Sequence, residues 1–554
     1  LTVYRAGFTT PAWFRTGVMY QIFPDRFARD SSATAQRGME HHRRMGQTVH
    51  CHAGWDEPVE WQANTPEGEY APVDFYGGTL RGIADRLHYL QKLGVTVLYL
   101  NPIFESASNH RYDTGDYRKV DPILGTNADF KKLCAAAADC GIRIVLDGVF
   151  AHTGADSRYF NRFRHYPGCG AYNSHSSVYA RWYSFAHYPD DYKCWWDFKD
   201  LPAVNAANPD WRKYMITGER SIVKTWLRDG ASGWRLDVAD ELPDDVLRGM
   251  RSAAKETDPD SVLLGEVWED AVTKVSYGER RQYALGDALD SVMNYPLRDG
   301  LVTFLTGRST ARALADLLLS QRLNYPRPLY YALMNLTASH DVARTRSALA
   351  LDFDPRSRTR AELAALEITD AMAARGAQLQ VLAAAVQFWL PGIPSIYYGD
   401  ETGMQGLCDP FNRAPLQMCD TQMLQWYAQL TALRHAHPAL TRGEVAVFAP
   451  AGDVLRVIAD GRDAFGEEAE DEALLLTVNR AAHPVRCHVE LTCPGAGLCE
   501  ETRLAFVRSE YDCAADCTDD THIAIHDGVG AFDLPPHAAK IYRLENRHGT
   551  ETGS

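Results

Sequence analysis

The sequence contains no long hydrophobic run: nowhere do 18 or more apolar residues follow one another. A membrane-spanning helix needs about 20 such residues, so we expect no membrane partner. Positive charge is also scarce, because the formal net charge is −15 at pH 7, and this argues against nucleic acid or anionic lipid as a partner. The N-terminus lacks a secretory signal pattern, which predicts a cytoplasmic protein. The chain starts at Leu1 rather than at Met, which weakens that prediction.

Cysteine pairs with metal-binding spacing are missing as well. The twelve cysteines are scattered, and none forms a CxxC pair of the zinc type. Three interpretations of these cysteines stay open. Free thiols are preferred, then disulfides in an extracellular protein, then metal ligation. Five cysteines fall in the C-terminal tail: Cys487, Cys493, Cys499, Cys513 and Cys517.

The length of 554 residues fits one large domain with a smaller domain appended. Strand-like runs rich in Val, Ile, Leu and Tyr recur eight times, as buried parallel strands should. They lie at 17–23, 95–104, 141–147, 233–238, 261–267, 291–297, 329–336 and 394–400. Helix-patterned stretches lie between several of them, at 82–94, 128–141 and 220–230. This alternation predicts the α/β class, and eight repeats predict a closed (β/α)8 TIM barrel.

Two segments depart from this rhythm. Residues 153–209 are rich in Tyr, Trp, His and Asp and show little helical periodicity, so we expect an inserted subdomain after the third strand. After a helix at 422–435, short alternating runs predict a C-terminal antiparallel β-sandwich domain. The acidic stretch 461–472 is expected to be an exposed loop. The predicted division is a barrel over 1–435, with 153–209 inserted, and a β-domain over 436–545.

Acidic residues stand where three of the buried strands should end: Asp237, Glu266 and Asp341. Their spacing fits strand–helix units of about 30 residues each. Another strand candidate ends at Asp147, and its distance from Asp237 implies an insertion. Because active sites of such barrels lie at the C-terminal ends of the strands, converging carboxylates predict a site that cleaves glycosidic bonds.

Several separate motifs, in order along the chain, support this prediction. They are YQIFPDRF (20–27), NHRYDTGDY (109–117), DGVFAH (147–152), LPAVN (201–205), GWRLDVADE (233–241), GEVW (265–268) and ASHD (338–341). The set resembles the α-amylase family, glycoside hydrolase family 13, over nearly the whole chain. LPAVN is similar to the pentapeptide of its neopullulanase, cyclomaltodextrinase and maltogenic amylase branch.

The resemblance implies a role for each acidic residue. Asp237 matches the nucleophile of a retaining glycosidase, and Arg235, two residues earlier on the same strand, is expected to lower its pKa. Glu266 matches the acid and base, which must carry a proton when the reaction starts. Asp341 matches the third acid, which orients the sugar hydroxyls.

The same resemblance implies a set of sugar-binding side chains. His110 and Tyr112 would contact and stack on the glucose at the cleavage point, and Trp268 would help to exclude water. His152 and His340 would hydrogen-bond sugar hydroxyls, and Asp409 and Arg413 would grip a sugar. Trp182, Trp195 and Trp196 either narrow the cleft or form the core of the inserted subdomain.

Other positions depart from the family pattern. Ala151 stands where many α-amylases carry a calcium-binding Asn, and Arg29 and Thr79 stand where the related branch often carries calcium ligands. Calcium prefers several carboxylate or carbonyl oxygens, so we expect no metal and no cofactor. The branch also tends to have an N-terminal domain that pairs subunits. Here the first barrel strand starts near residue 17, so we expect a monomer or weak homodimer.

The resulting hypothesis is retaining hydrolysis of α-1,4-glucosidic bonds, with α-1,6 bonds as a further target, in maltodextrins, cyclodextrins or pullulan. We expect small oligosaccharides and cyclodextrins to be better substrates than starch. An α-glucan transglycosylase or a pullulanase would use the same three acids and stays open. A catalytically dead glucan-binding scaffold is the alternative of a different class, but such relatives lack one or more of the acids that this chain retains.

Overall fold

A closed barrel of eight parallel strands forms the centre of the molecule. The structure is a computed structural model that describes residues 2–66, 68–466, 472–490, 502–508, 522–524 and 529–546. The strands follow the spatial order β14-β11-β10-β7-β4-β1-β16-β15, and a parallel bridge between Met293 and Met334 joins the two ends of this order. They are Met19–Ile22 (β1), Val97–Leu100 (β4), Arg143–Gly148 (β7), Gly233–Leu236 (β10), Val262–Gly265 (β11), Ser291–Val292 (β14), Met334–Leu336 (β15) and Ile393–Tyr397 (β16). The predicted barrel is confirmed.

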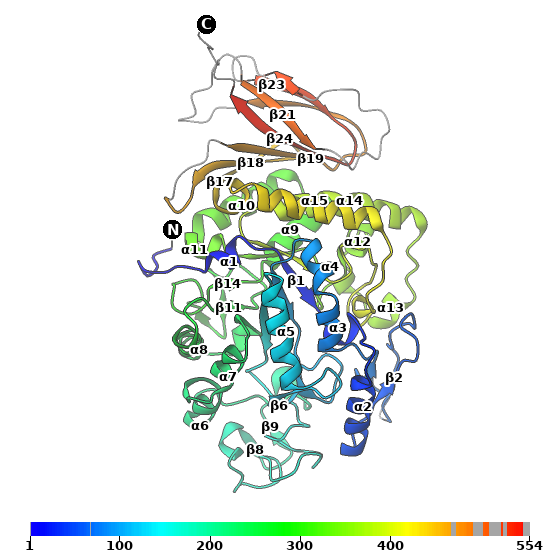
Figure 1. Cartoon of the computed structure of the whole chain (residues 1–554), viewed down its shortest axis with the longest axis vertical. Coiled ribbons are helices and arrows are strands. Elements are labelled where there is room, and N and C mark those ends of the chain that lie inside the picture. The colour runs from blue at the N-terminus through cyan, green and yellow to red at the C-terminus, as the bar shows by residue number, and fades with distance from the viewer. Residues whose placement is uncertain are drawn as a thin grey trace.

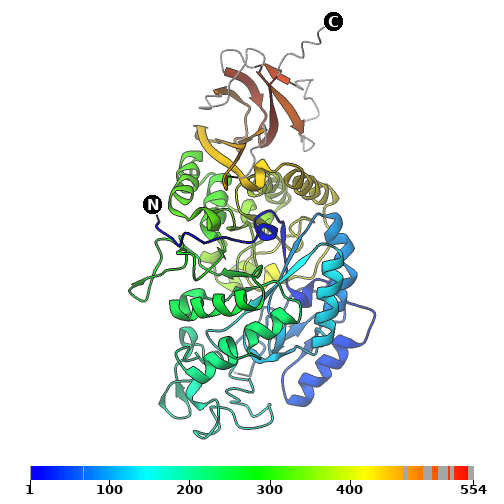
Figure 2. The ribbon, with the colours of Figure 1, turned by 60° about the vertical axis from the view of Figure 1, so that its left-hand side comes forward.

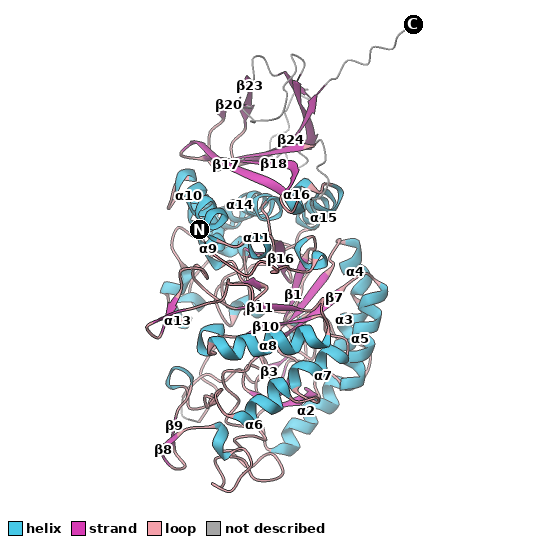
Figure 3. Ribbon diagram, turned by 90° about the vertical axis from the view of Figure 1, so that its left-hand side faces the viewer, coloured by secondary structure: helices cyan, strands magenta, loops and turns pink. Residues whose placement is uncertain are grey.

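Helices lie on the outside of the barrel, as the turned views show (Figures 2 and 3). The longer ones are Leu80–Asp85 (α3), Leu87–Lys92 (α4), Asn127–Asp139 (α5), Ile222–Arg228 (α7), Asp244–Thr257 (α8), Tyr295–Leu305 (α9), Ala311–Asn324 (α10), Thr345–Ala350 (α12), Asp370–Trp389 (α14) and Thr421–Ala436 (α15). Short helices are Ala12–Arg15 (α1), Pro209–Arg212 (α6), Arg327–Tyr330 (α11), Arg360–Ala364 (α13) and Ala439–Arg442 (α16). The connection from β11 to β14 contains a hairpin, Val275–Ser276 (β12) with Glu279–Arg280 (β13), where the other units have helices.

Several predicted elements are shorter or divided in the structure. In the run 95–104, for example, the barrel strand is only Val97–Leu100. In the run 291–297 only Ser291–Val292 is strand, because the Asn294 side chain accepts from the Leu297 N–H and starts α9 there. In the run 329–336 the strand is confined to Met334–Leu336, since its first residues belong to α11. The single helix predicted at 82–94 is two helices that meet at Arg86.

The barrel interior is a packed core. Met19, Val97, Tyr99, Val145, Val262, Leu264, Met334 and Ile393 are among its wholly buried members. A second, larger cluster fills the layer between the strands and the surrounding helices. These two layers of apolar side chains fix the strand ends, and the strand ends in turn fix the polar side chains that follow them.

Long connections extend the barrel at the end where β8 and β9 lie, opposite the C-terminal strands (Figure 1). The first connection carries the helix Thr34–Met45 (α2) and the short pair His50–Cys51 (β2) with Asp74–Phe75 (β3). The second carries the hairpin Phe104–Ser106 (β5) with Thr114–Val120 (β6). After β7, the region predicted as an insertion contains only short elements, including Phe185–His187 (β8) and Asp191–Tyr192 (β9).

Two antiparallel sheets form the C-terminal part and confirm the predicted β-sandwich. One contains Gly443–Ala451 (β17), Val454–Asp463 (β18), Ala473–Asn479 (β19), Thr502–Arg508 (β21), His522–Ala524 (β22) and Ala538–Asn546 (β24), and the other pairs Val485–Glu490 (β20) with Val529–Leu534 (β23). Side chains from both sheets, such as Leu475 and Phe532, share one core. The six-stranded sheet contacts α10, α14 and α16, and Figure 1 shows the C-terminal strands stacked on this end of the barrel. The proposed boundaries at 435 and 545 stay predictions.

The prediction that 461–472 is an exposed loop was wrong at its start. Ala464 is buried, and the Arg15 guanidinium lies over the Phe465 ring, so this part packs against the barrel. Residues 467–471 lie outside the described part. The eight described cysteines, Cys487 included, are free thiols, and the other four tail cysteines lie outside it. Within the described ranges, no helix combines the length and hydropathy that a membrane crossing requires.

Candidate active site

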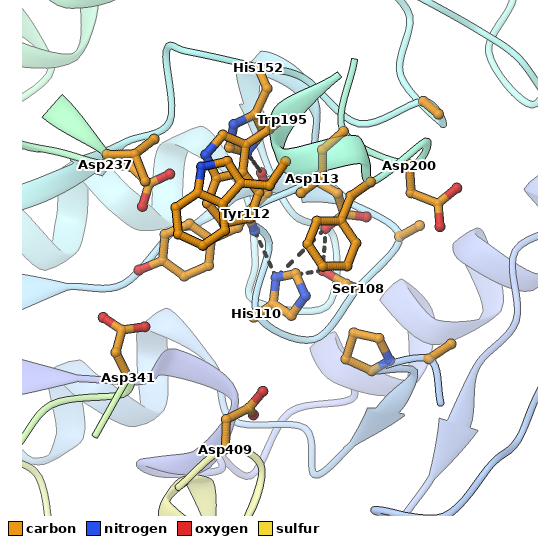
Figure 4. Close-up of a pocket in the computed structure, with 18 of the residues that line it drawn as sticks. Ser108, His110, Tyr112, Asp113, His152, Trp195, Asp200, Asp237, Asp341 and Asp409 are labelled. Carbon is orange, nitrogen blue, oxygen red and sulfur yellow. Dashed lines mark hydrogen bonds and ion pairs between the residues drawn. The ribbon is translucent and has the colours of Figure 1, made fainter. Parts of the chain in front are cut away.

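Three carboxylates predicted from strand ends meet in one cavity. Asp237 follows the last residue of β10, Glu266 follows β11, and Asp341 lies in the loop after β15. All three line a cavity of about 1140 Å³, and so do all the other predicted site residues except Arg235. Figure 4 shows Asp237 and Asp341 on the same side of this cavity, with His152 above them and Asp409 below them in the view.

Arg235 lies beneath the carboxylates and connects them. Its Nη1 is 2.9 Å from an oxygen of Asp147 and 2.9 Å from Oδ1 of Asp237, and its Nη2 is 3.0 Å from Oε2 of Glu266. The sheet register explains this arrangement, because Arg235 on β10 stands beside Asp147 on β7 and beside Leu264 on β11. Residues two apart on a strand point to the same side, which places Arg235 next to Asp237.

Arg235 lowers the pKa of Asp237, as predicted, but burial and the neighbouring carboxylates outweigh this effect. Burial raises the pKa of Asp237 well above its usual range; Arg235 acts in the opposite direction, but Glu266, Asp147 and Asp341 add to the rise. Burial and then the charge of Glu266 raise the pKa of Asp341 to about 7. At Asp237, Arg235 therefore acts against burial and the neighbouring carboxylates, and it favours the charged form that a nucleophile needs.

The backbone and Trp268 hold the two oxygens of Glu266. The Val238 N–H donates to Oε2 at 2.7 Å, and the Trp268 indole N–H donates to Oε1 at 3.0 Å. Val238 has a φ of 39°, a left-handed conformation that a β-branched residue rarely adopts. Strain of this kind gathers at functional sites. Trp268 itself stacks on Tyr295, with 3.9 Å between ring centroids.

His340 is a neutral hydrogen-bond donor on the third acid's side of the cavity. The amide nitrogen of Gln21 lies 2.8 Å from its Nδ1, so Nδ1 accepts and the proton is on Nε2. Nε2 lies 2.6 Å from the Tyr112 hydroxyl and 3.1 Å from Oδ1 of Asp341. The Tyr112 hydroxyl donates to Asp147. Burial, with the charge of Arg235, brings the pKa of His340 well below its usual value.

Three rings face the cavity together: His110 and Tyr112 from one motif, and His152 from the motif that ends β7. Arg111 has a φ of 63°, which turns the chain between His110 and Tyr112. The Tyr112 N–H donates to Nδ1 of His110, which leaves Nε2–H of His110 as the donor available to a ligand. Nε2 of His152 donates to the Tyr112 carbonyl, while its buried Nδ1 has no hydrogen-bond partner within the described residues. Burial lowers the pKa of His152 to about 4.

Asp409 and Arg413 form an ion pair of 2.8 Å at the cavity wall. Nε of Arg413 donates to the His340 carbonyl at 3.1 Å, which ties this pair to the loop of the third acid. Of the three predicted tryptophans, Trp182 is 3% exposed and belongs to the core. Trp195 and Trp196 line the cavity.

Sequence reasoning assigned no role in the site to four residues that hold it: Asp147, Tyr99, Gln21 and Tyr295. Asp147 accepts from Tyr99 at 2.6 Å and from Arg235, and its position at a strand end was the signal that marked it. Gln21 sits in the first motif, YQIFPDRF. Tyr295 donates to Asp341 at 3.2 Å, and nothing in its local pattern indicated this contact.

The positions at which relatives often bind calcium do not fit a calcium ion here. The Arg29 guanidinium donates to the carbonyls of His52 and Tyr76, at 3.1 and 2.6 Å, so a fixed positive charge already faces these oxygens. The Thr79 hydroxyl caps α3 by accepting from the Gly82 N–H. Ala151 offers no side-chain oxygen.

Comparison with known proteins identifies the family. The catalytic domain of α-amylase matches residues 21–415, which includes the whole set of barrel strands from Gln21 onward and all three acids. The chain belongs to the α-amylase family of glycoside hydrolases. The family's fold and the site geometry agree with the motifs in the sequence.

Individual relatives are named for several activities. An amylopullulanase of Thermoanaerobacterium saccharolyticum is 36% identical over 89% of this chain, and a cyclomaltodextrinase of Geobacillus thermopakistaniensis is 32% identical over 86% of it. The match covers 70% of that cyclomaltodextrinase, but the chain spans only 27% to 40% of the length of the amylopullulanases that it matches. The solved cyclic α-maltosyl-(1→6)-maltose hydrolase of Arthrobacter globiformis superposes with a TM-score of 0.71 at 27% identity, covering 97% of this chain and all of that one.

Proposed function

We propose that this protein is a retaining glycoside hydrolase that cleaves α-1,4-glucosidic bonds, and α-1,6 bonds as well, in maltodextrins, cyclodextrins or pullulan. The observation that carries the proposal is the contact of Asp237 and Glu266 with the same Arg235 guanidinium at the floor of the cavity. A retaining enzyme needs its two carboxyl groups close together, about 5 Å apart, since no water has to fit between one of them and the sugar.

The reaction follows from the roles that the geometry allows. Asp237 attacks the anomeric carbon while Glu266 gives its proton to the oxygen of the leaving sugar. This forms a glycosyl–Asp237 ester and breaks the glycosidic bond. Glu266, now a carboxylate, takes a proton from water, and the water oxygen displaces Asp237. Asp341, with neutral His340 as a neighbouring donor, holds the hydroxyls of the distorted sugar.

The neutral side chains of the cavity suit a neutral sugar. His110, His152 and His340 all have pKa values below the usual one because they are buried, so they are uncharged near pH 7. Nε2–H of His110 can donate to a sugar hydroxyl, whereas Nε2–H of His152 is used by the Tyr112 carbonyl. Steady-state kinetics with β-cyclodextrin, maltotriose, pullulan and soluble starch test the substrate class. We expect higher kcat/KM for β-cyclodextrin or maltotriose than for starch, and a clear preference for starch would reject this assignment. Transfer products from added maltose would favour the transglycosylase alternative.

We further propose that no calcium ion is needed. Arg29 supports this, because its guanidinium faces the carbonyls of His52 and Tyr76. We expect turnover and melting temperature to be unchanged by EDTA. A loss of either that calcium alone restores would contradict the proposal. The monomeric or weakly dimeric state stays a prediction.

A further inference from the structure

Tyr277 is an aromatic side chain that the reaction described above does not use. It lies at the tip of the β12–β13 hairpin, lines the cavity and is 75% exposed. Among the Phe, Tyr and Trp side chains of the described residues, only Trp196, at 72%, approaches this exposure, and Trp196 lines the same cavity. Single exposed apolar residues are common on protein surfaces, so exposure alone does not indicate a binding site.

The backbone at the hairpin tip is strained. Tyr277 and Gly278 form the two-residue turn, with φ values of 53° and 80°. Turns with two positive φ angles favour Asn-Gly, because a left-handed conformation costs most side chains roughly 1–2 kcal/mol. Trp196 has a φ of 47° and is likewise a bulky aromatic residue in this region. Strain at an exposed tip is a reason to look for function there.

Side chains of the hairpin contact the segment that directly follows Asp237 in the sequence. The Tyr277 hydroxyl donates to Oε1 of Glu241, and Nζ of Lys274 lies 2.9 Å from Asp240. These two acidic residues come just after Val238, whose N–H holds Glu266. Since Glu266 protonates the oxygen of the departing sugar, the departing part of the substrate lies on the Glu266 side of the cleft. The hairpin therefore belongs to the leaving-group side.

We infer that Tyr277 binds the leaving-group part of an α-glucan by stacking its ring on the apolar face of a glucose unit. The inference rests on the proposed function and names a contact of that same site. The connection from β11 to β14 has this hairpin where the other units have helices, and its tip offers an aromatic face to the cavity. The hydrogen bond to Glu241 fixes the direction of the ring.

Two substrates with very different leaving groups test this. Maltoheptaose places glucose units there, whereas α-maltosyl fluoride leaves only a fluoride ion. We expect Y277A to lower kcat/KM for maltoheptaose about 3- to 10-fold, as loss of an aromatic contact predicts. Hydrolysis of α-maltosyl fluoride should change less than about 2-fold. Equal losses on both substrates, or no loss on either, would overturn the inference.

Two further variants separate stacking by the Tyr277 ring from a positioning role of its hydroxyl. Y277F keeps the ring and loses the bond to Glu241, so it should retain most of the maltoheptaose activity; a loss as large as that of Y277A would show that Tyr277 acts by positioning Glu241 instead. F448A removes another exposed aromatic side chain, on β17, and should have no effect.

If the wild-type protein hydrolyses neither substrate, the proposed function fails. Calorimetric binding of maltoheptaose to D237N, with and without Y277A, then decides the stacking contact: unchanged affinity would overturn it.

Discussion

The floor and the rim of the cleft are built in different ways. At the floor, Arg235 and Asp147 are wholly buried, and each is held by neighbours on adjacent strands. At the rim, Trp196 and Tyr277 project from short irregular connections and are mostly exposed. The strand register alone sets the floor, so its chemistry follows from the barrel. The rim depends on loop conformations that the barrel does not dictate, so substrate length and acceptor preference can differ without any change in the chemistry.

The largest effect should come from removing either reacting carboxylate. We expect D237N and E266Q each to lower kcat on maltodextrins by about 10⁴-fold or more, because the proposed mechanism uses both residues in the bond-breaking step. Melting temperatures should stay near that of the wild type. Steady-state rates on maltoheptaose measure the loss.

The same two variants differ in how they respond to an activated leaving group. Fluoride needs no proton to depart, so α-maltosyl fluoride should restore much of the first step in E266Q but not in D237N. Restoration in D237N alone would reverse the two assigned roles.

Removing the cation at the floor should have the next largest effect. R235A leaves the Asp147, Asp237 and Glu266 carboxyl groups without their partner, which costs about 3–5 kcal/mol of unfolding free energy. The loss should be larger at pH 8 than at pH 5. The reason is that Asp147 and Asp237, whose pKa values are raised by burial, then carry uncompensated charge at the higher pH and are neutralised by protons at the lower one. Urea unfolding at the two pH values measures it.

Arg434 provides the matched control for that prediction. It is also wholly buried, but it donates to backbone carbonyls such as that of Phe388 rather than to carboxylates. R434A should destabilise the protein by a similar amount at both pH values. Equal pH dependence in the two variants would contradict the role given to Arg235 at the floor.

A smaller effect, of opposite sign, should follow from D341N. Burial raises the pKa of Asp341 to about 7, above its unfolded value near 3.8, so its ionisation costs stability as the pH rises from about 4 to 7. D341N should therefore raise the unfolding free energy by about 2 kcal/mol at pH 8, with a gain that shrinks toward pH 4. Activity should fall, since the amide cannot support the distorted sugar. A destabilised D341N at pH 8 would show that the carboxylate contributes to the fold.

The sequence predicted the floor better than the rim, for physical reasons. Asp237 and Glu266 directly follow apolar runs, so their positions could be predicted from strand patterns. The sequence did not indicate that the pKa of Asp237 lies above its usual value. That shift depends on burial and on Asp341, which is far away along the chain.

Elements with little local signal were predicted less well. β14 is two residues long, and the pattern that suggested a longer strand belongs partly to the start of α9. The β12–β13 hairpin was not predicted, because its two-residue turn has Tyr277 where such turns usually have Asn. The strands β21, β22 and β23 also went unrecognised.

The anomeric configuration of the first-formed product tests the central claim most directly. Asp237 and Glu266 contact the same guanidinium, that of Arg235, so the two carboxyl groups lie close together. This spacing implies two successive displacements at the anomeric carbon, which restore its original configuration. Proton NMR in the first minutes of maltodextrin hydrolysis should therefore show the α-anomer before mutarotation mixes the two forms. Predominance of the β-anomer at that time would contradict the double displacement and, with it, the role given to Asp237.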